Sequence, residues 1–493
     1  MNALNRRTFL KTVSLAASAG LTARLTSSSA WAEPIGSNGD LRIAVIGFNA
    51  KGANHISDLL KLSGVRIVAL CDVDPKVLAR EVDKLKAQQI SVFATTDARR
   101  VFERADVDAV VIATSNHWHA LLTVWACQAG KDVYVEKPVS HTLWEGRKMI
   151  EAAAKYGRVV QTGTQYRSDI GWPEAIAWLE AGNLGKIRAV HTICYKLRES
   201  IGRRLPWYPD WLDYDMYCGP TPMVPLQRDR LPYDWHWDWN TGNGELGNNG
   251  VHVLDIARRV SGHEGSPTRV TSLGGRYGVD DVSTTPNTQL AVFEFAGGIP
   301  ILFESRGLPA KPGVKYMDNF RGMRGPNGLA ALCEGGYLSG YTGAVAYDPD
   351  GKQIKRFTGD GGRGHMTNFL NAVRARRPQD LAAPIEVGHA STSFCHFGNI
   401  AHRVGATTDL AAARAAIEAI PDAVAALQDM QRNLGVHGID LEKTPVTVGP
   451  WLQIDAANET IAAVEGGSET TLEHAKFLLK ETQRAPWMIP DVV

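Results

Sequence analysis

The hydrophobic positions in the first half of the chain fall into short runs that alternate with stretches of helical pattern. Leu41–Ile46, Ala105–Thr114 and Asp132–Lys137 are largely apolar runs of this kind. Apolar runs without alternation are typical of parallel strands that are buried on both faces. Their alternation with helices predicts an α/β fold, a doubly wound parallel Rossmann sheet, over residues 41–160.

From Leu184 onward the pattern changes to strands separated by Gly and Pro turns. In Thr288–Ala296 apolar and polar positions tend to alternate, as in an antiparallel strand with one face buried. We therefore expect an α+β domain with an open, mainly antiparallel sheet over residues 161–403. Residues 404–493 are rich in alanine and predict a helical C-terminal extension.

The first residues carry the pattern of an export signal. The pair Arg6-Arg7 precedes a mild apolar stretch, and Ala30–Ala32 follows it, so residues 1–32 are predicted to be a twin-arginine signal peptide. Cleavage at its end would leave a polar linker, residues 33–40, on a protein delivered to the periplasm by the twin-arginine export machinery. The apolar stretch is short and contains Arg24, so no stable membrane span is expected. The alternative is a chance arginine pair on a disordered tail.

Composition and charge narrow the range of partners. The 493 residues carry a net charge of +1 and the basic residues are dispersed, so nucleic acid is not an expected partner. None of the six cysteines lies in a C-x-x-C pair, so neither a metal site nor thioredoxin-like redox chemistry is predicted. Most of the cysteines are expected to be small buried apolar side chains.

The turn after the first strand is a candidate dinucleotide site. Gly47, Phe48, Asn49 and Gly52 fit the spacing G-x-N-x-x-G, in which Asn49 replaces the second glycine of the usual fingerprint. The backbone of such a turn, and the start of the helix after it, bind a pyrophosphate. Asp72 lies twenty residues after Gly52, where an acid binds ribose hydroxyls and repels a 2′-phosphate, so NAD is favoured over NADP. The alternative is that Asp72 only ends a strand.

Polar side chains follow two further predicted strands. Thr114–Asn116 and His119 come after one strand, and Glu136–Pro138 come after another. Doubly wound sheets bind ligands at the carboxyl ends of their strands, so these side chains are expected at the cofactor. The alternative is that Lys137 is an exposed lysine at a strand end.

These motifs together resemble the Gfo/Idh/MocA family, which includes glucose–fructose oxidoreductases, inositol dehydrogenases and NAD-dependent glycosidases. The resemblance extends over residues 41 to about 403 and implies that Lys137 lies beside the nicotinamide and the reacting hydroxyl of the substrate. The motifs that carry it are the strand and turn ending at Gly52, Asp72, TSNHWH (Thr114–His119), Glu136–Pro138 and QTGTQYR (Gln161–Arg167). The residues implied to bind the cofactor are Gly47, Phe48, Asn49, Gly52, Asp72, Thr114, Ser115, Asn116, His119, Glu136, Lys137 and Gln165.

The resemblance also indicates an acid/base group in the second domain. Family members carry an acid four residues before a histidine on one helix, and the matching residues here are Asn248 and His252. This implies that His252 is the proton-transfer partner of Lys137, a role that suits an imidazole. Asn248 cannot exchange a proton near neutral pH, but it can hold a substrate hydroxyl by hydrogen bonding. Asp255, about one turn further, is a candidate substrate contact.

Structural roles are the alternative for these second-domain side chains. Asn248 or its neighbour Asn249 could cap the helix. Asp255 could pair with Arg259, one turn later on the same helix. The sequence alone leaves both interpretations open.

An aromatic cluster precedes this helix. Five of the thirteen tryptophans lie between Trp207 and Trp239. Aromatic faces suit the C–H-rich faces of sugar rings, so His236 and Trp237 are candidate substrate contacts. A small satellite core under a long loop explains the same residues about as well.

Location and chemistry together predict an exported NAD(P)-dependent oxidoreductase that acts on a sugar or polyol hydroxyl. Free pyridine nucleotide is not expected outside the cytoplasm, so the cofactor would be loaded before export, held tightly and returned to its starting redox state in each cycle. A redox-neutral NAD-dependent glycosidase meets the same requirement. A non-catalytic nucleotide- or sugar-binding protein is the alternative from another class. By resemblance, the open sheet face favours a homo-oligomer.

Overall fold

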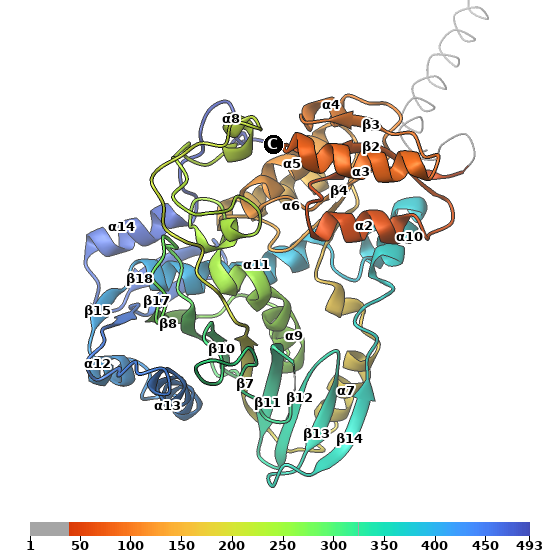
Figure 1. Ribbon diagram of the computed structural model, residues 1–493. Helices are drawn as coiled ribbons and strands as arrows, with labels where there is room; N and C mark the ends of the chain where they lie inside the picture. The colour runs from red at the N-terminus through yellow and green to blue at the C-terminus, as the bar shows by residue number, and fades with distance from the viewer. Residues whose placement is uncertain (1–38, 324) are drawn as a thin grey trace, which may run out of the picture.

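The computed structural model describes residues 39–323 and 325–493 of the chain (Figure 1). The predicted signal peptide, residues 1–32, and most of the predicted linker lie outside the described residues. Within the described ranges, no helix combines the length and the apolar character that crossing a membrane requires.

The first domain is built on a six-stranded parallel sheet with the order β3-β2-β1-β4-β5-β6. This is the order of a doubly wound Rossmann sheet, so the predicted fold class is confirmed. The central strands are buried on both faces, which explains why their sequences do not alternate. The strands are β1 Leu41–Ile46, β2 Val65–Cys71, β3 Phe93–Thr95, β4 Ala109–Ile112, β5 Asp132–Val135 and β6 Val160–Thr162. The helices between them are α2 Lys51–Leu59, α3 Pro75–Ala87, α4 Arg99–Phe102, α5 Asn116–Gln128 and α6 Leu143–Tyr156.

The second domain is built on a larger sheet with the order β14-β13-β12-β11-β7-β10-β9-β8-β16-β15, to which β17 and β18 attach at β8. Among the described strand pairs, β7 and β10 run parallel and the others of this sheet run antiparallel, which confirms the predicted sheet type. Its strands are β7 Ile187–Tyr195, β8 Arg269–Gly275, β9 Thr288–Glu294, β10 Ile301–Arg306, β11 Asn327–Cys333, β12 Gly336–Tyr341, β13 Gly343–Tyr347, β14 Gln353–Thr358, β15 Ala406–Thr408, β16 Val446–Val448, β17 Leu452–Asp455 and β18 Thr460–Val464.

Helices cover both faces of this second sheet. On one face α9 (Val251–Ser261) and α11 (Ile385–Arg403) pack into the main core, and α11 also contacts α6 of the first domain. On the other face α12 (Leu410–Ala415) and α13 (Pro421–Gly435) pack on β8, β9 and β10. The remaining helical segments are η1 Gln165–Ser168, α7 Gly171–Glu180, α8 Tyr214–Cys218, η2 Asp234–Trp237, the π-helical turn η3 Leu246–Gly250, α10 His365–Ala375, η4 Pro378–Asp380 and α14 Glu469–Leu478.

The prediction of a helical extension over residues 404–493 is right only in part. Helices α12, α13 and α14 lie there, but so do β15, β16, β17 and β18, which join the large sheet. These strands are only three to five residues long. A run of that length is too short to show a clear period of two. Whether it forms a strand depends on pairing with residues that are distant in the sequence. The region is therefore part of the second domain.

Two segments from much later in the chain complete the core of the first domain. Phe369 and Leu370 of α10 enter the apolar cluster on one face of the Rossmann sheet, and α10 lies beside α2 in Figure 1. Trp487 and Ile489 enter the cluster on the other face, with Trp118 of α5. The first domain is therefore not confined to the predicted residues 41–160.

Candidate active site

One cavity of about 510 Å³ lies at the carboxyl ends of the Rossmann strands and is lined by residues from both domains. Its volume is in the range of cofactor and small-molecule sites, and this edge of a doubly wound sheet is where ligands bind. The cavity brings together most of the site residues that the sequence indicated. They are Gly47, Phe48, Asn49, Asp72, Thr114, Ser115, Asn116, His119, Glu136, Lys137, Gln165, His236, Asn248 and His252.

The turn after β1 has the shape of a phosphate cradle. Gly47 has a φ of +78°, and a Cβ on it would lie 2.8 Å from Cγ2 of Thr114. A Cβ on Gly52 would lie 2.0 Å from the carbonyl oxygen of Gly47, so the close approach of the two backbone segments requires glycine at position 52. Asn49 has no positive φ, and its Oδ1 lies 3.5 Å from the Arg80 guanidinium. The backbone conformation at position 49 therefore does not require glycine.

Asp72 connects this turn to the end of β2. Its Oδ2 accepts a hydrogen bond from the N–H of Phe48 at 2.9 Å, and its Oδ1 accepts one from the N–H of Asp74 at 3.0 Å. Burial raises the pKa of the Asp72 carboxyl to about 6, although both backbone bonds favour the charged form. Asp72 faces the cavity at the position where an acid that binds ribose is expected.

Two buried histidines hold the turn that follows β5. Nε2 of His55 lies 2.8 Å from Oε1 of Glu136, and Nδ1 of His119 lies 2.7 Å from the carbonyl oxygen of Pro138. Burial alone would raise the pKa of the Glu136 carboxyl, but the His55 contact keeps it below its usual value. The N–H of Lys137 donates to Oε2 of Glu136 at 3.3 Å. This carboxylate therefore fixes the backbone that carries Lys137.

Lys137 reaches across the cavity to the second domain. Its Nζ donates to the carbonyl oxygen of Asn248 at 2.8 Å and lies 3.4 Å from Oδ1 of the same residue. Asn248 lies in the turn η3, which continues directly into α9, and His252 in the first turn of α9 lines the same cavity. No side chain caps α9, so the alternative role of Asn248 or Asn249 as a helix cap is wrong.

Two buried polar atoms at this place have no hydrogen-bond partner among the described residues. They are Nδ2 of Asn248 and Nδ1 of His252. Buried polar groups in folded proteins are nearly always satisfied, often by water or a bound ligand. The ring of Tyr166, which sequence reasoning did not single out, stands edge-to-face on the His252 ring with 5.3 Å between centroids. An unsatisfied amide and imidazole beside an amine are what a hydroxyl-bearing ligand would complete.

Burial shifts the titration of Lys137 and His252 in the same direction. It lowers the pKa of the Lys137 ammonium below its ordinary value, against the opposing charge of Glu136. It lowers the pKa of the His252 imidazolium well below its ordinary value, and the charge of Lys137 adds to this effect. His252 is therefore neutral near pH 7, which is the form that a general base needs.

Asp255 does not line the cavity. Its two carboxylate oxygens each accept a hydrogen bond from Nε of Arg167 at 2.9 Å, and one also accepts from Oγ of Ser391 at 2.5 Å. The predicted substrate contact is therefore wrong. The alternative, that Asp255 forms a structural ion pair, is confirmed, but its partner is Arg167 rather than Arg259. A partner this distant in sequence carries no local signal.

The aromatic cluster supplies one wall of the cavity, but through different residues than expected. His236 lines the cavity, whereas Trp237 lies behind the wall and packs under the Arg198 guanidinium, 4.6 Å from its centre. Tyr233 and Trp235 line the cavity instead, and the Trp235 ring stacks on His236 with 3.6 Å between centroids. The prediction for Trp237 is therefore wrong, because the turn of η2 directs its neighbours inward. Part of the cluster forms the small core of the alternative interpretation: Tyr217, Cys218, Leu226 and Leu231, with Trp207 packed against them.

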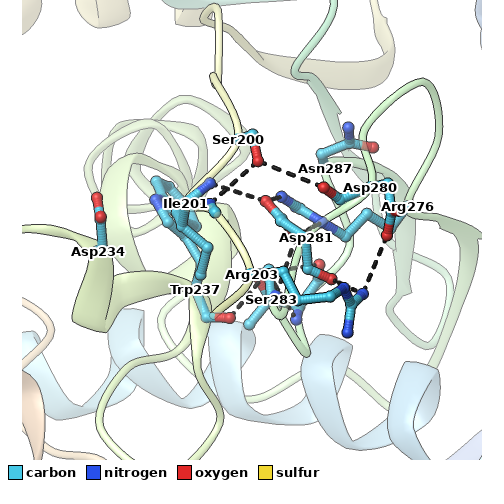
Figure 2. A network of polar contacts seen from close by, with 12 residues as sticks. Ser200, Ile201, Arg203, Asp234, Trp237, Arg276, Asp280, Asp281, Ser283 and Asn287 are labelled. Carbon is cyan, nitrogen blue, oxygen red and sulfur yellow. Dashed lines mark hydrogen bonds and ion pairs between the residues drawn. The ribbon is translucent and has the colours of Figure 1, made fainter. Parts of the chain in front are cut away.

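Residues 198–245, which we call the aromatic segment, are fastened to the second domain by a polar network around Asp281 (Figure 2). The buried Asp281 carboxylate accepts hydrogen bonds from the N–H groups of Ile201 at 2.9 Å and Ser283 at 3.0 Å. Oγ of Ser283 donates in turn to the carbonyl oxygen of Trp237 at 2.8 Å. The network therefore fixes η2, the element that presents the aromatic wall.

We expect Asp281→Ala to lower the free energy of unfolding by about 3 kcal/mol, because it leaves the largely buried Arg276 guanidinium without its ion-pair partner. Thermal unfolding followed by circular dichroism measures the change. Asp280→Ala is the matched control: its side chain is 93% exposed and pairs with Arg203 at the surface, so the expected loss is below about 0.5 kcal/mol. Equal losses in the two variants would show that Asp281 is no special anchor.

Comparison with known proteins relates both domains to one family. Residues 41–164 match the Gfo/Idh/MocA model described as an oxidoreductase family with an NAD-binding Rossmann fold, and residues 200–434 match the C-terminal alpha/beta domain of that oxidoreductase family. An inositol 2-dehydrogenase/D-chiro-inositol 3-dehydrogenase of Shouchella clausii is 36% identical over 156 residues, which are 31% of this chain and 44% of that protein. A glycosyl hydrolase family 109 protein of Shewanella pealeana is 32% identical over 170 residues, covering 31% of this chain and 37% of that protein. These alignments span less than half of each curated relative.

Solved structures share the fold over a larger part of the chain. The aldose-aldose oxidoreductase from Caulobacter crescentus, complexed with glycerol, has a TM-score of 0.53 at 18% identity and covers 78% of this chain and 98% of its own. A levoglucosan dehydrogenase in complex with NADH has a TM-score of 0.53 at 16% identity and covers 73% of this chain and 95% of its own. With the two family models spanning both domains, the chain belongs to the Gfo/Idh/MocA family of oxidoreductases and carries its NAD-binding Rossmann domain.

Proposed function

We propose that the protein is an exported oxidoreductase that uses tightly held NAD(H) to oxidise or reduce a sugar or polyol at a hydroxyl-bearing carbon. The observation that carries the proposal is the 2.8 Å contact between Nζ of Lys137 and the carbonyl oxygen of Asn248. Lys137 of the first domain and Asn248 of the second also line the same cavity as His252 and the turn that begins at Gly47, which supports the proposal. The relatives that are inositol dehydrogenases support a polyol or sugar as the substrate class.

The residues present fit a nicotinamide dinucleotide. Gly47 and Gly52 leave no room for a Cβ, so the turn between them would hold the pyrophosphate against the N-terminus of α2. Asp72, at the end of β2, would hold the adenosine ribose. When bound, NAD supplies the acceptor for a hydride, and the protein supplies the groups that manage the proton.

Each group beside Lys137 then has a definite task. In the oxidative direction the neutral imidazole of His252 accepts the proton of the substrate hydroxyl. Lys137 donates a hydrogen bond to the same oxygen and stabilises the negative charge that develops on it. Asn248 orients Lys137 through its carbonyl oxygen and its Oδ1, which leaves a further amine hydrogen for the substrate. Tyr233, Trp235 and His236 would form an aromatic wall against the C–H side of a sugar ring.

Export and retention of the cofactor are the finer part of the proposal. The Arg6-Arg7 pair and Ala30–Ala32 support export through the twin-arginine machinery. Sequencing of the mature protein from the periplasm should begin at Glu33, and a full-length cytoplasmic protein would contradict export. Size-exclusion chromatography with light scattering would test the proposed homo-oligomer.

Nucleotide analysis tests the core of the proposal. The purified protein is denatured, and the supernatant is assayed for NAD(P) by absorbance and mass. We expect close to one NAD per chain. Sugars and polyols added to the intact protein should then raise the absorbance near 340 nm persistently. The absence of both bound nucleotide and measurable NAD affinity would support the non-catalytic alternative.

A redox-neutral glycosidase is the second candidate function. The alignment with the glycosyl hydrolase family 109 protein of Shewanella pealeana is the observation that favours it. Such an enzyme oxidises its substrate transiently and reduces it again after the glycosidic bond has broken. A transient rise of absorbance together with release of an aglycone from a nitrophenyl glycoside would identify it.

The preference for NAD over NADP should narrow as the pH falls through about 6, the pKa to which burial raises the Asp72 carboxyl. Above this pH the carboxylate is charged and repels a 2′-phosphate, and below it the carboxyl is neutral. Titration calorimetry with both nucleotides between pH 5 and 8 measures the ratio of the two Kd values. In Asp72→Asn the ratio should be small and should depend less on pH, whereas a ratio in the wild type that does not change with pH would contradict the role of Asp72.

A further inference from the structure

The last part of the chain, residues 481–493, which we call the C-terminal segment, bridges the two domains. Nε1 of Trp487 donates to Oδ2 of Asp215 in α8 at 3.2 Å, and the side chain of Arg484 pairs with the same carboxylate. On the first domain, Nε2 of Gln483 donates to Oε1 of Glu145 in α6 at 2.8 Å. The segment is therefore fixed from both sides and does not lie free on the surface.

Trp487 is the centre of these contacts. Its indole is 4% exposed and meets Trp118 and Trp125 of α5 at centroid distances of 5.4 and 6.3 Å. The Arg99 guanidinium lies over its ring at 4.9 Å. In spite of this packing, Trp487 lines the large cavity. The indole is therefore held at one place in the cavity wall.

The strand order shows which end of the cavity Trp487 lines. In the order β3-β2-β1-β4-β5-β6, Lys137 follows β5, whereas Asp72 follows β2 and Thr96–Ala98 follow β3. All of these residues line the one cavity, so it extends from the β5 end to the β3 end. Because the acid after β2 binds the ribose of the adenosine half, the adenine of a dinucleotide lies at the end away from Lys137. Trp487 lies at that end, because it contacts Arg99, the residue after Ala98. The apolar cluster that contains Trp487 also supplies apolar and aromatic residues to the cavity lining: Ala98, Trp118, Leu122, Trp125 and Met216.

We propose that Trp487 forms one wall of the adenine subsite, so that the C-terminal segment of the second domain is part of the dinucleotide-binding site. The inference rests on the proposed use of NAD and goes beyond it, because it assigns binding of the adenosine half to residues outside the Rossmann domain. Aromatic surfaces bind bases by stacking, without regard to the chemistry at the other end of the ligand. Trp487 should therefore affect ligands that contain adenine and no others.

The test compares three ligands: NAD, ADP-ribose, which carries the adenosine half, and nicotinamide mononucleotide, which lacks it. Trp487→Leu keeps an apolar side chain in the core but removes the aromatic face. By titration calorimetry on nucleotide-free protein, it should raise the Kd of NAD and of ADP-ribose about tenfold or more. The Kd of nicotinamide mononucleotide should stay within about twofold of the wild type, since no stacked base is lost. Trp487→Phe should restore most of the lost affinity.

Trp144→Leu is the matched control. Trp144 contacts the same end of the chain through Lys480, whose Nζ lies 4.5 Å from its ring, but it does not line the cavity. The Trp144→Leu variant should bind NAD, ADP-ribose and nicotinamide mononucleotide with the wild-type affinities. If Trp487→Leu does not fold, Trp487→Met, which fills the same space with a flexible chain, takes its place.

The outcomes separate this inference from the proposed function. Wild-type affinity of Trp487→Leu for ADP-ribose, or an equal loss for nicotinamide mononucleotide, would overturn the role of Trp487 and leave the use of NAD standing. A wild-type protein that binds neither NAD nor ADP-ribose would overturn both. A loss confined to NAD and ADP-ribose, recovered in Trp487→Phe, establishes the adenine wall.

Discussion

Lys137→Met should lower kcat by about 10³-fold and leave the affinity for NAD near that of the wild type. Methionine has nearly the length of lysine, but it cannot donate to Asn248 or to a substrate oxygen. In the wild type, kcat should also fall as the pH rises through the pKa of Lys137, which burial lowers below the ordinary lysine value. Steady-state kinetics between pH 6 and 10 measure both effects. The residual activity of Lys137→Met should lack this basic limb.

Lys131→Met is the matched control for this change. The Lys131 amine is also largely buried in the first domain, and it donates to the carbonyl oxygens of Arg104 and Val107 at 2.7 and 2.9 Å, away from the cavity. The Lys131→Met variant should have a lower free energy of unfolding but no loss of kcat comparable to that of Lys137→Met. Turnover by Lys137→Met at the wild-type rate would remove the amine from the mechanism.

His252→Gln should lower kcat by about 10²-fold, because the amide is a far weaker proton acceptor than a neutral imidazole. Burial lowers the pKa of His252 well below its ordinary value, so the histidine stays neutral as the pH falls from 8 to 6. The wild-type kcat/KM should therefore show no acidic limb at the pH typical of an exposed histidine. Initial rates over that range measure it.

His263→Gln is the companion control. His263 follows α9, stacks on Phe295 with 3.5 Å between ring centroids, and lies outside the cavity. It should keep the wild-type kcat and pH profile. Equal activities of His252→Gln and the wild type would exclude His252 as the proton acceptor.

The Rossmann half of the site could be predicted from sequence because its signals are local. The apolar strands, the turn from Gly47 to Gly52 and the strand-end position of Lys137 each lie within a few residues, and the strand-end rule brings them to one edge. The prediction that Lys137 lies near Asn248 and His252 came from family resemblance. Lys137 contacts Asn248 at 2.8 Å, and all three residues line one cavity, whereas their roles in catalysis stay predictions.

Features that depend on distant parts of the chain could not be predicted. Asp255 pairs with Arg167, which lies in another element, so the i+4 pattern with Arg259 was misleading. The inward face of the aromatic segment depends on the turn η2, which favours Trp235 over Trp237 at the cavity wall. A single tryptophan near the end of the chain, such as Trp487, has no periodicity and no motif, and its place in the cavity is visible only in the folded protein.

The way α10 and the C-terminal segment return to the first domain has a mechanical consequence. The chain passes between the domains after β6, again on either side of α10, and once more before Trp487. The two domains are therefore connected at several places rather than by a single hinge. A large hinge motion between the domains would expose Phe369 and Trp487 to water. The loss of this apolar burial costs more free energy than ordinary thermal fluctuations provide. A fragment limited to residues 41–160 would expose both of these patches to water. The two domains therefore share core side chains, and we expect them to unfold together as one cooperative unit.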